Sequence, residues 1–211
     1  MIKKTIFNLE PFKVLNEDTN EICYGCNQNW YTTVWQRMAG CGPTTATNLL
    51  LYLDSSRQTP DPTRFKTKKG CLALMEDVWK YITPTFRGVS TTKIFYEGLI
   101  SYAKSKGFDT EYYFVDIPED KTSRPGLSSV LNFLDGALSK DVPVAFLNLC
   151  NGAEKNLDRW HWVTILALKY TENAEQAFIN ILDNGEIKEV DLALWYNTTT
   201  KDGGFVYLKK R

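Results

Sequence analysis

The chain has 211 residues, of which 43% are hydrophobic and 13% aromatic, which excludes an intrinsically disordered protein. Its 25 basic and 25 acidic residues balance to a formal net charge of zero, so nothing in the charge favours nucleic acid or an anionic membrane as a partner. No apolar run approaches the roughly 20 residues that span a bilayer, and we expect no membrane-spanning segment.

The start of the chain and its cysteines bear on the compartment. Residues 1–18 begin with a short basic stretch, but acidic residues and asparagine interrupt it before an apolar core forms, which argues against a signal peptide. The number of cysteines is odd, unlike the disulfide framework of a small secreted protein. They are Cys23, Cys26, Cys41, Cys71 and Cys150. These features predict a reducing, cytoplasmic setting.

Helical periodicity dominates the first half of the chain. In four segments, apolar residues recur at spacings of three and four, which predicts helices with one apolar face. These segments are 43–54, 71–82, 91–105 and 127–139. Pro43 suits the opening turn of the first helix, where its missing N–H costs nothing. The polar, turn-rich residues 54–69 predict a loop.

Strand patterns dominate the second half. Runs rich in Val, Ile, Leu and Phe indicate strands, and the middle ones have the composition of strands buried on both faces. The predicted strands are 111–117, 142–149, 160–169, 177–183, 186–190 and 204–209. Residues 170–176 suit a hairpin loop. Helices followed by strands predict one α+β domain over residues 1–211, with the helices packed on a mostly antiparallel sheet.

One cysteine stands where a reactive thiolate is favoured. Cys41 lies in the sequence Gly40-Cys41-Gly42-Pro43, at the start of the helix 43–54. The unpaired N–H groups and the positive end of a helix dipole stabilise a thiolate, which is the nucleophilic form. Gly40 and Gly42 leave room for a substrate carbonyl, and the Cys41 N–H is placed to donate to an oxyanion.

A thiol nucleophile also needs a base. The chain has a single histidine, so any histidine-dependent chemistry must use His161. This residue lies at the mouth of the strand 160–169, between Trp160 and Trp162. Their rings would keep water away from an imidazolium–thiolate pair and so strengthen it.

The base needs an orienting group on its second ring nitrogen. If the strands 160–169 and 177–183 form a hairpin that turns near residue 172 or 173, residues 182–186 return to the side of the histidine. Asp183, Asn184 and Glu186 are then all within reach of the imidazole.

Four short blocks in this order resemble the papain-like cysteine peptidases, and among these the sequence is most similar to the bacteriocin-processing, double-glycine branch. The blocks lie within residues 35–54 and 159–186. They are Gln36, Cys41-Gly42-Pro43 at the start of a Leu-rich helix, His161-Trp162-Val163 at the start of a strand, and Leu182-Asp183 at the end of the next strand.

The resemblance implies a papain-like fold and a role for four residues. It makes Cys41 the nucleophile, His161 the general base and acid, and Asp183 the group that orients the imidazole. It also makes Gln36 the side-chain donor to the oxyanion. However, Gln36 precedes the cysteine by one position fewer than in several branches of the family, and Gln28 is a more distant substitute.

Each residue also has a purely structural interpretation. In this alternative, Cys41 is a small buried hydrophobic residue, and His161 is a core histidine. Asp183 is also read as a turn residue, because Asp-Asn-Gly strongly favours a turn. Cys23 and Cys26 have the spacing of zinc ligands, but a structural zinc site needs two further ligands. We therefore expect neither a metal nor another cofactor.

The sequence thus predicts a cysteine peptidase-like hydrolase that cleaves a peptide or small amide through a thioester on Cys41. Two alternatives use the same scaffold. The first is an acyltransferase or amidase that acts on a small molecule or a carrier-bound acyl group. The second is a non-catalytic binding module.

Overall fold

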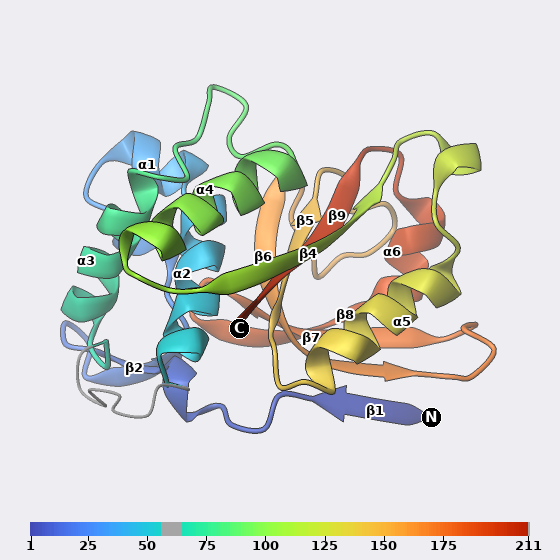
Figure 1. The fold of residues 1–211 in the computed structure, drawn as a ribbon, viewed down its shortest axis with the longest axis horizontal. Coiled ribbons are helices and arrows are strands. Elements are labelled where there is room, and N and C mark those ends of the chain that lie inside the picture. The colour runs from blue at the N-terminus through green and yellow to red at the C-terminus, as the bar shows by residue number, and fades with distance from the viewer. Residues whose placement is uncertain (56–64, 211) are drawn as a thin grey trace.

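The structure is a computed structural model that describes residues 1–55 and 65–210. Its main element is a seven-stranded sheet with helices on both faces (Figure 1). The strands are β1 (Ile2–Thr5), β2 (Lys13–Asn16), β3 (Glu21–Tyr24), β4 (Thr110–Ile117), β5 (Val144–Asn148), β6 (His161–Tyr170), β7 (Ala177–Asp183), β8 (Glu186–Asp191) and β9 (Gly203–Lys210). The helices are α1 (Val34–Ala39), α2 (Cys41–Ser55), α3 (Lys68–Trp79), α4 (Thr92–Ser105), α5 (Leu127–Leu138) and α6 (Leu192–Thr198).

All neighbouring strands of the large sheet are antiparallel. The order is β4-β9-β5-β6-β7-β8, with β1 paired to the far end of β6, while β2 and β3 form a separate hairpin. The α+β class predicted from the sequence is confirmed, with helices packed on an antiparallel sheet. The predicted helices and strands are all present; the short elements β1, β2, β3, α1 and α6 were not predicted. Most of the predicted loop 54–69 lies outside the described residues.

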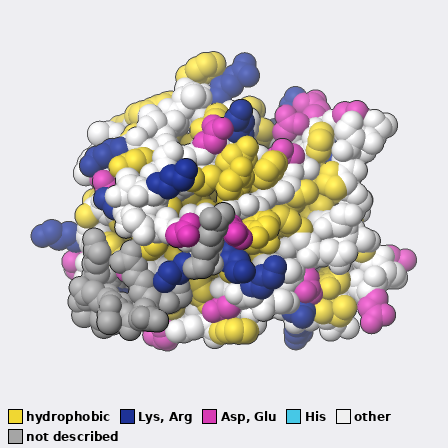
Figure 2. All heavy atoms as spheres, in the orientation of Figure 1, with side chains coloured by type: hydrophobic (Ala, Val, Ile, Leu, Met, Phe, Trp, Pro, Cys, Tyr) yellow, Lys and Arg dark blue, Asp and Glu magenta, His cyan; other side chains and the backbone are white. Residues whose placement is uncertain are grey.

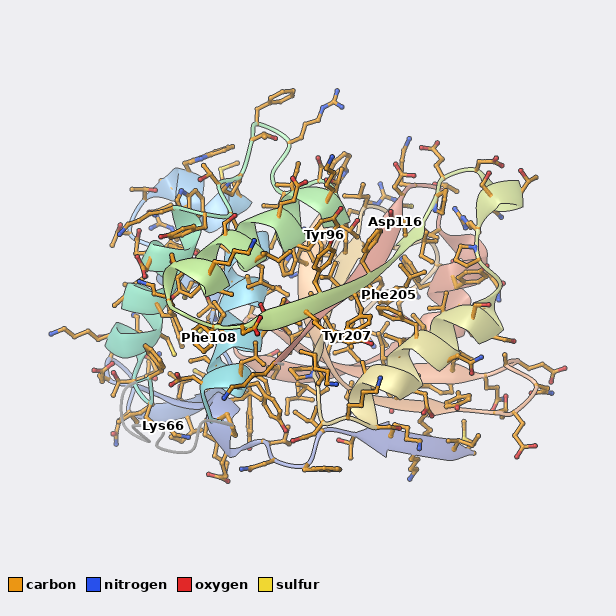
Figure 3. All side chains as sticks on the ribbon, in the orientation of Figure 1. Lys66, Tyr96, Phe108, Asp116, Phe205 and Tyr207 are labelled. Carbon is orange, nitrogen blue, oxygen red and sulfur yellow. The ribbon has the colours of Figure 1, made fainter. Side chains whose placement is uncertain are left out.

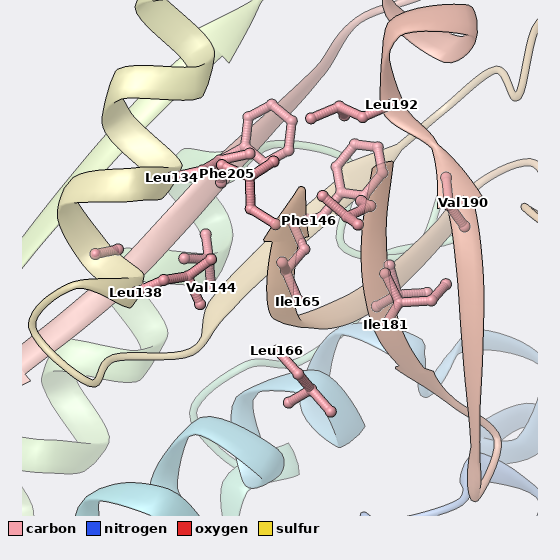
Figure 4. Packing of buried hydrophobic residues seen from close by; sticks show 14 of the residues in the cluster. Leu134, Leu138, Val144, Phe146, Ile165, Leu166, Ile181, Val190, Leu192 and Phe205 are labelled. Carbon is pink, nitrogen blue, oxygen red and sulfur yellow. The ribbon is translucent and has the colours of Figure 1, made fainter. Parts of the chain in front are cut away.

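Alternation along the central strands creates two cores. Val144 and Phe146 of β5 face a core closed by α5 and α6, part of which Figure 4 shows. Ala145 and Leu147 face the opposite core, which α2, α3 and α4 cover. Because successive side chains of a strand point to opposite faces, a strand buried on both sides needs apolar residues at every position. This accounts for the continuous apolar runs in the sequence.

An aromatic cluster surrounds β4 at the edge of the sheet. Tyr96 of α4 packs on Tyr112 and Phe114 from one face of β4, while Tyr207 of β9 stacks on Tyr113 from the other (Figure 3). The three β4 aromatics stay partly exposed. Hydrophobic side chains accordingly gather at the centre of the face in Figure 2. This ring packing fastens the edge strand to α4 on one face and to the neighbouring strand β9 on the other.

Two turns place the end of β7 beside the start of β6. Strands β6 and β7 pair antiparallel up to Tyr170 and Ala177, which confirms the predicted hairpin. Strands β7 and β8 are joined by Asn184 and Gly185, with φ angles of 51° and 88°. Two successive left-handed residues make the tight hairpin turn that Asn-Gly favours. Asp183 is therefore held at the last position of a strand rather than in a loop.

Candidate active site

The start of α2 places Cys41. The helix begins at Cys41 itself, and α1 ends two residues earlier at Ala39, so Gly40 alone separates the two helices. A Cβ on Gly40 would lie 2.4 Å from the carbonyl oxygen of Gln36 and 2.5 Å from the Tyr31 ring. A Cβ on Gly42 would lie 2.7 Å from Val89. Both glycines are thus required by close packing, which fixes the thiol at the helix N-terminus.

The imidazole of His161 lies between Asp183 and Cys41. His161 Nε2 is 2.7 Å from Asp183 Oδ1, and the imidazole also hydrogen-bonds to the Cys41 thiol. Because Asp183 occupies Nε2, Nδ1 is the nitrogen that serves Cys41. All three side chains are buried: His161 and Cys41 are each 8% exposed, and Asp183 is 5% exposed. The structure thus brings together three of the four residues named from the sequence.

The pKa values of the acid–base pair move in opposite directions. Burial lowers the pKa of His161, but the hydrogen bonds to Asp183 and Cys41 outweigh it and raise the pKa to about 10. Burial raises the pKa of Asp183, but its hydrogen bond to the imidazole and the nearby positive charges hold this pKa below its ordinary value. Both shifts favour an imidazolium paired with a carboxylate.

Lys188 of β8 is a site residue that the sequence reasoning missed. Its Nζ lies 2.7 Å from Asp183 Oδ2, so the two carboxylate oxygens serve two different cations. Burial lowers the pKa of Lys188, but Asp183 raises it overall. The signal was present in the sequence: an Asn-Gly turn fixes the β7–β8 register, in which Glu186 faces Asp183 and Lys188 lies on the same face two residue pairs further along.

The other two candidates for orienting the histidine have other surroundings. Asn184 occupies the turn, where its carbonyl oxygen accepts a hydrogen bond from Asn27 Nδ2 at 2.6 Å. Glu186 begins β8 opposite Asp183 and is exposed. Of the three residues left open by the sequence, Asp183 is the one bonded to the imidazole.

The two glutamines lie in different surroundings. Gln36 sits in α1, where its side chain completes a capping box with Thr33 and its Nε2 donates to Glu76 Oε2 at 2.8 Å. Gln36 lines neither of the two hollows whose walls include Cys41. Gln28, from a 3-10 turn, lines a small cleft with Cys41 and His161. Its Nε2 donates to the carbonyl oxygen of Arg37 at 2.7 Å, which fixes the amide.

Trp160 has an unusual backbone at the edge of the site. Its φ is 55°, in the left-handed region, which costs roughly 1–2 kcal/mol for a residue with a side chain. Its carbonyl oxygen lies 3.9 Å from Cys41 Sγ, and its indole is half exposed. Strain of this kind persists where the surroundings impose it, which is common in functional sites.

A second, larger groove also includes Cys41 in its wall. Its volume is about 690 Å³, and its wall includes Cys41 but not His161. Apolar side chains make up most of the lining, from α1, the loop before α4, β5 and Trp160. The remaining lining residues are charged: Arg87, Glu119, Lys201 and Asp202.

One group among the described residues has ligand atoms close enough for a metal ion. Those of Asp158, His161 and Asp183 lie within 4.8 Å of one another. His161 and Asp183 are bonded to each other, and Asp183 is also paired with Lys188. The Lys188 ammonium thus already neutralises the Asp183 carboxylate that a metal ion would need as a ligand. We therefore assign this group to acid–base chemistry. The spaced pair Cys23 and Cys26 belongs to no such group in the described ranges.

No helix in the described part of the chain is long and apolar enough to cross a membrane. Comparison with known proteins finds no matching family model and no matching curated protein. Solved structures do match, among them UfSP from C. elegans, with a TM-score of 0.57 and 8% sequence identity. That match covers 100% of this chain and 34% of the UfSP chain, so the chain spans about a third of its length.

At this identity the likeness concerns the fold. It supports the papain-like architecture that the motif order implied, and it does not support the finer resemblance to the bacteriocin-processing branch. The chain has a papain-like α+β fold in which a cysteine opens a helix packed against an antiparallel sheet.

Proposed function

We propose that the protein is a cysteine hydrolase that cleaves a peptide or amide bond through a thioester on Cys41. The observation that carries this proposal is the imidazole of His161, which is bonded to Asp183 on one side and to the helix-start thiol on the other. A nucleophile, a base and an orienting carboxylate in this arrangement are the components of nucleophilic catalysis.

In the proposed mechanism, the Cys41 thiolate attacks the substrate carbonyl carbon while His161 is an imidazolium. The imidazolium gives its Nδ1 proton to the leaving amine, and the C–N bond breaks to leave a thioester. The now neutral imidazole takes a proton from water, and the resulting hydroxide attacks the thioester. Collapse releases the carboxylic acid and restores the thiolate–imidazolium pair.

The oxyanion formed in each step needs hydrogen-bond donors. We propose the backbone N–H of Cys41 and the side chain of Gln28, in place of the Gln36 expected from the motif. The support is that Gln28 lines the cleft with Cys41 and His161, whereas the Gln36 amide is bonded to Glu76. Nε2 of Gln28 carries two hydrogens, one of which is held by Arg37. The second is available to the oxyanion.

Lys188 is proposed as a positioning residue for the acid–base pair. A buried carboxylate with one partner is costly, because its second oxygen lacks a hydrogen bond. The ammonium of Lys188 supplies that bond and keeps Asp183 ionised, so that Oδ1 stays aimed at the imidazole.

The comparison supports a hydrolase at a coarse level. UfSP is a papain-like cysteine protease, and the shared fold is compatible with peptidase-like activity here. Hydrolysis and acyl transfer share the thioester, so the nature of the acceptor separates them. We favour water as the acceptor, because the shared fold is that of a cysteine protease.

The proposal is tested by hydrolysis of a fluorogenic peptide library by the wild-type protein, the Cys41→Ala variant and the matched Cys150→Ala variant. We expect release of the fluorophore by wild type and Cys150→Ala, and a loss of at least about 10³-fold in Cys41→Ala, as expected on removal of a covalent nucleophile. Turnover that persists in Cys41→Ala, or a folded wild type that turns over no library member, contradicts the proposal. Mass spectrometry of a quenched reaction would show the acyl group on Cys41.

A further inference from the structure

Two buried cysteines that the proposed reaction does not use contact each other in the core. Cys26 is 1% exposed and Cys71 is 0% exposed, and both are free thiols in the core that α2, α3 and α4 cover. The Cys71 thiol donates to the carbonyl oxygen of Phe65 at 3.2 Å, and the Cys26 thiol hydrogen-bonds to Cys71. The two sulfur atoms therefore face each other.

The backbone around the pair brings the two thiols together. Cys26 follows β3, and the β2–β3 hairpin lies against the start of α3, where the Leu15 N–H donates to the carbonyl oxygen of Lys66 at 2.8 Å (Figure 1). Further along the chain, the Tyr31 hydroxyl donates to the carbonyl oxygen of Met75 in α3 at 3.3 Å. The segment from Cys26 to Tyr31 is thus held against α3 from both sides, so the contact between the thiols is set by the fold.

Cys23 and Cys26 have the spacing of a ligand pair, but they lie in different surroundings. Cys23 is partly exposed, and its sulfur lies beside Gly185 in the β7–β8 turn, 3.7 Å from where a Cβ on that glycine would be. Cys26 instead packs in the core with Cys71 of α3. The neighbour of Cys26 in space thus comes from a distant part of the sequence.

We propose that Cys26 and Cys71 form a modification site, at which a peroxide converts the two thiols into an intramolecular disulfide. A disulfide needs two sulfur atoms that can approach to about 2 Å without a large movement of the backbone. Two thiols in hydrogen-bond contact on elements that pack against each other meet this condition. The proposal does not depend on the reaction at Cys41, because neither thiol has a part in it.

Cys26 is the thiol that meets the oxidant first, because it lines the small cleft, whereas Cys71 lies deeper in the core. Its sulfur attacks one oxygen of hydrogen peroxide, and the O–O bond breaks to give a sulfenic acid and one water. The Cys71 sulfur then attacks the Cys26 sulfur. The S–O bond breaks, and the hydroxyl group leaves with the Cys71 proton as a second water. The two thiols lose two electrons, which reduce the peroxide to two waters.

The bridge would fasten the turn that carries Gln28 to α3. The Cys26 N–H already donates to Asn48 Oδ1 of α2 at 2.8 Å, so the bridge would join α2 and α3 through this one segment. It would also close a long stretch of the chain, which includes all of α1 and α2. Closure of a long stretch restricts the unfolded chain, so we expect the oxidised protein to be the more stable form.

The test is peptide mapping of the Cys41→Ala variant after exposure to hydrogen peroxide. This variant removes the helix-start thiol, which would compete for the peroxide, and the readout needs no turnover. Burial raises the pKa of Cys26, so the exposure is long and at mildly alkaline pH, where more thiolate forms. We expect one main cross-linked peptide pair, which joins Cys26 to Cys71 and which dithiothreitol separates. A main link between Cys23 and Cys26, or no link at all, overturns the proposal.

Thermal denaturation of the same variant is a second measurement. Peroxide should raise its Tm by about 5 °C or more, and dithiothreitol should reverse the rise. Added Cys23→Ala should keep the rise, whereas added Cys71→Ala should abolish it. Each protein is compared with its own reduced form, so any loss of stability caused by the substitution cancels. A rise that persists in Cys71→Ala contradicts the choice of partner. A linked protein whose Tm does not rise contradicts the view that the fold presets the contact.

These results are independent of the proposed function. If Cys41 is not a nucleophile, the fluorogenic library is not cleaved, but the Cys26–Cys71 link still forms. If the cysteine pair is assigned wrongly, the link is missing and the acyl group on Cys41 is still found.

Discussion

The small cleft and the larger groove both include Cys41 in their walls, and they differ in polarity, exposure and size. In the cleft of His161 and Asp183, polar atoms are buried, paired and held at hydrogen-bond distance. In the groove, most of the lining side chains are apolar, and those of the rim are exposed, namely Trp35, Met38, Phe86 and Trp160. The contrast separates two tasks: the cleft fixes the direction of proton transfer, and the groove supplies binding area. Changes in the cleft should therefore act on kcat, and changes in the groove on KM.

Replacement of each glutamine in turn by alanine should give the largest difference in kcat. Gln28→Ala should lower kcat by about 10²–10³-fold, as loss of one oxyanion donor does in other hydrolases. Gln36→Ala should leave kcat within about twofold, because its amide is bonded to Glu76 outside the cleft. Gln36→Ala should instead lower the melting temperature slightly, since it removes the Gln36 side-chain half of the capping box and leaves the Thr33 cap in place. The reverse ranking of the two kcat values would return the oxyanion role to Gln36.

Removal of the Lys188 ammonium gives a smaller effect. Lys188→Met leaves the second oxygen of Asp183 without this cation, which should raise the pKa of Asp183 and move the acid limb of the kcat/KM profile toward neutral pH. We expect a loss of about 10-fold at pH 6, or about 1.4 kcal/mol. Lys188→Arg should restore most of the activity, because a guanidinium also pairs with a carboxylate.

The matched control for Lys188 is Lys3→Met, which makes the same exchange at an exposed position of β1 in the same sheet. It should leave the pH profile of kcat/KM unchanged. An acid limb that stays in place in Lys188→Met would show that the ammonium contributes stability alone.

The dependence of stability on pH tests the cleft without a substrate. The pKa of His161 is raised to about 10, above the roughly 6.5 of an unfolded histidine. Its contribution to stability is thus fully present below pH 6.5 and is lost as the pH rises through 10. Urea denaturation at several pH values should show this decline in the wild type. His161→Gln should flatten the difference across that window. Parallel curves for the two proteins would mean that His161 is not held as an imidazolium.

The sequence was most informative where regular structure carries a functional residue. Helical periodicity located α2 and the cysteine at its start, and the apolar runs located β6 and β7 with the hairpin between them. A hairpin returns the chain to a predictable place, so Asp183 was among the candidates for the neighbour of His161. A strand register is set by turn geometry and by which face is buried, and both leave a trace in the sequence.

The parts that the sequence left open depend on irregular backbone. Gln28 reaches the cleft through a 3-10 turn followed by α1, so its distance from Cys41 in the chain says nothing of its distance in space. The groove is lined by residues of a helix, a loop and a strand, together with residues near positions 119 and 201. No sequence motif or periodicity links these segments. The motif pointed to Gln36, whose side chain is instead used to cap α1. Local capping and loop paths are set by tertiary packing, which single-sequence patterns do not record.

The most direct test of the central claim is the pH dependence of iodoacetamide labelling, resolved for each cysteine by peptide mapping. Cys150 is a demanding internal control. Burial raises its pKa, but hydrogen bonds around Thr200 and Gly152 and the charge of Arg159 outweigh it and lower the pKa to about 7. We expect Cys41 to label faster than Cys150 at pH 6 in the wild type, and His161→Ala to remove this advantage while Cys150 is unaffected. Labelling of Cys41 that is slower than that of Cys150 at pH 6, or unchanged in His161→Ala, would contradict the thiolate–imidazolium pair.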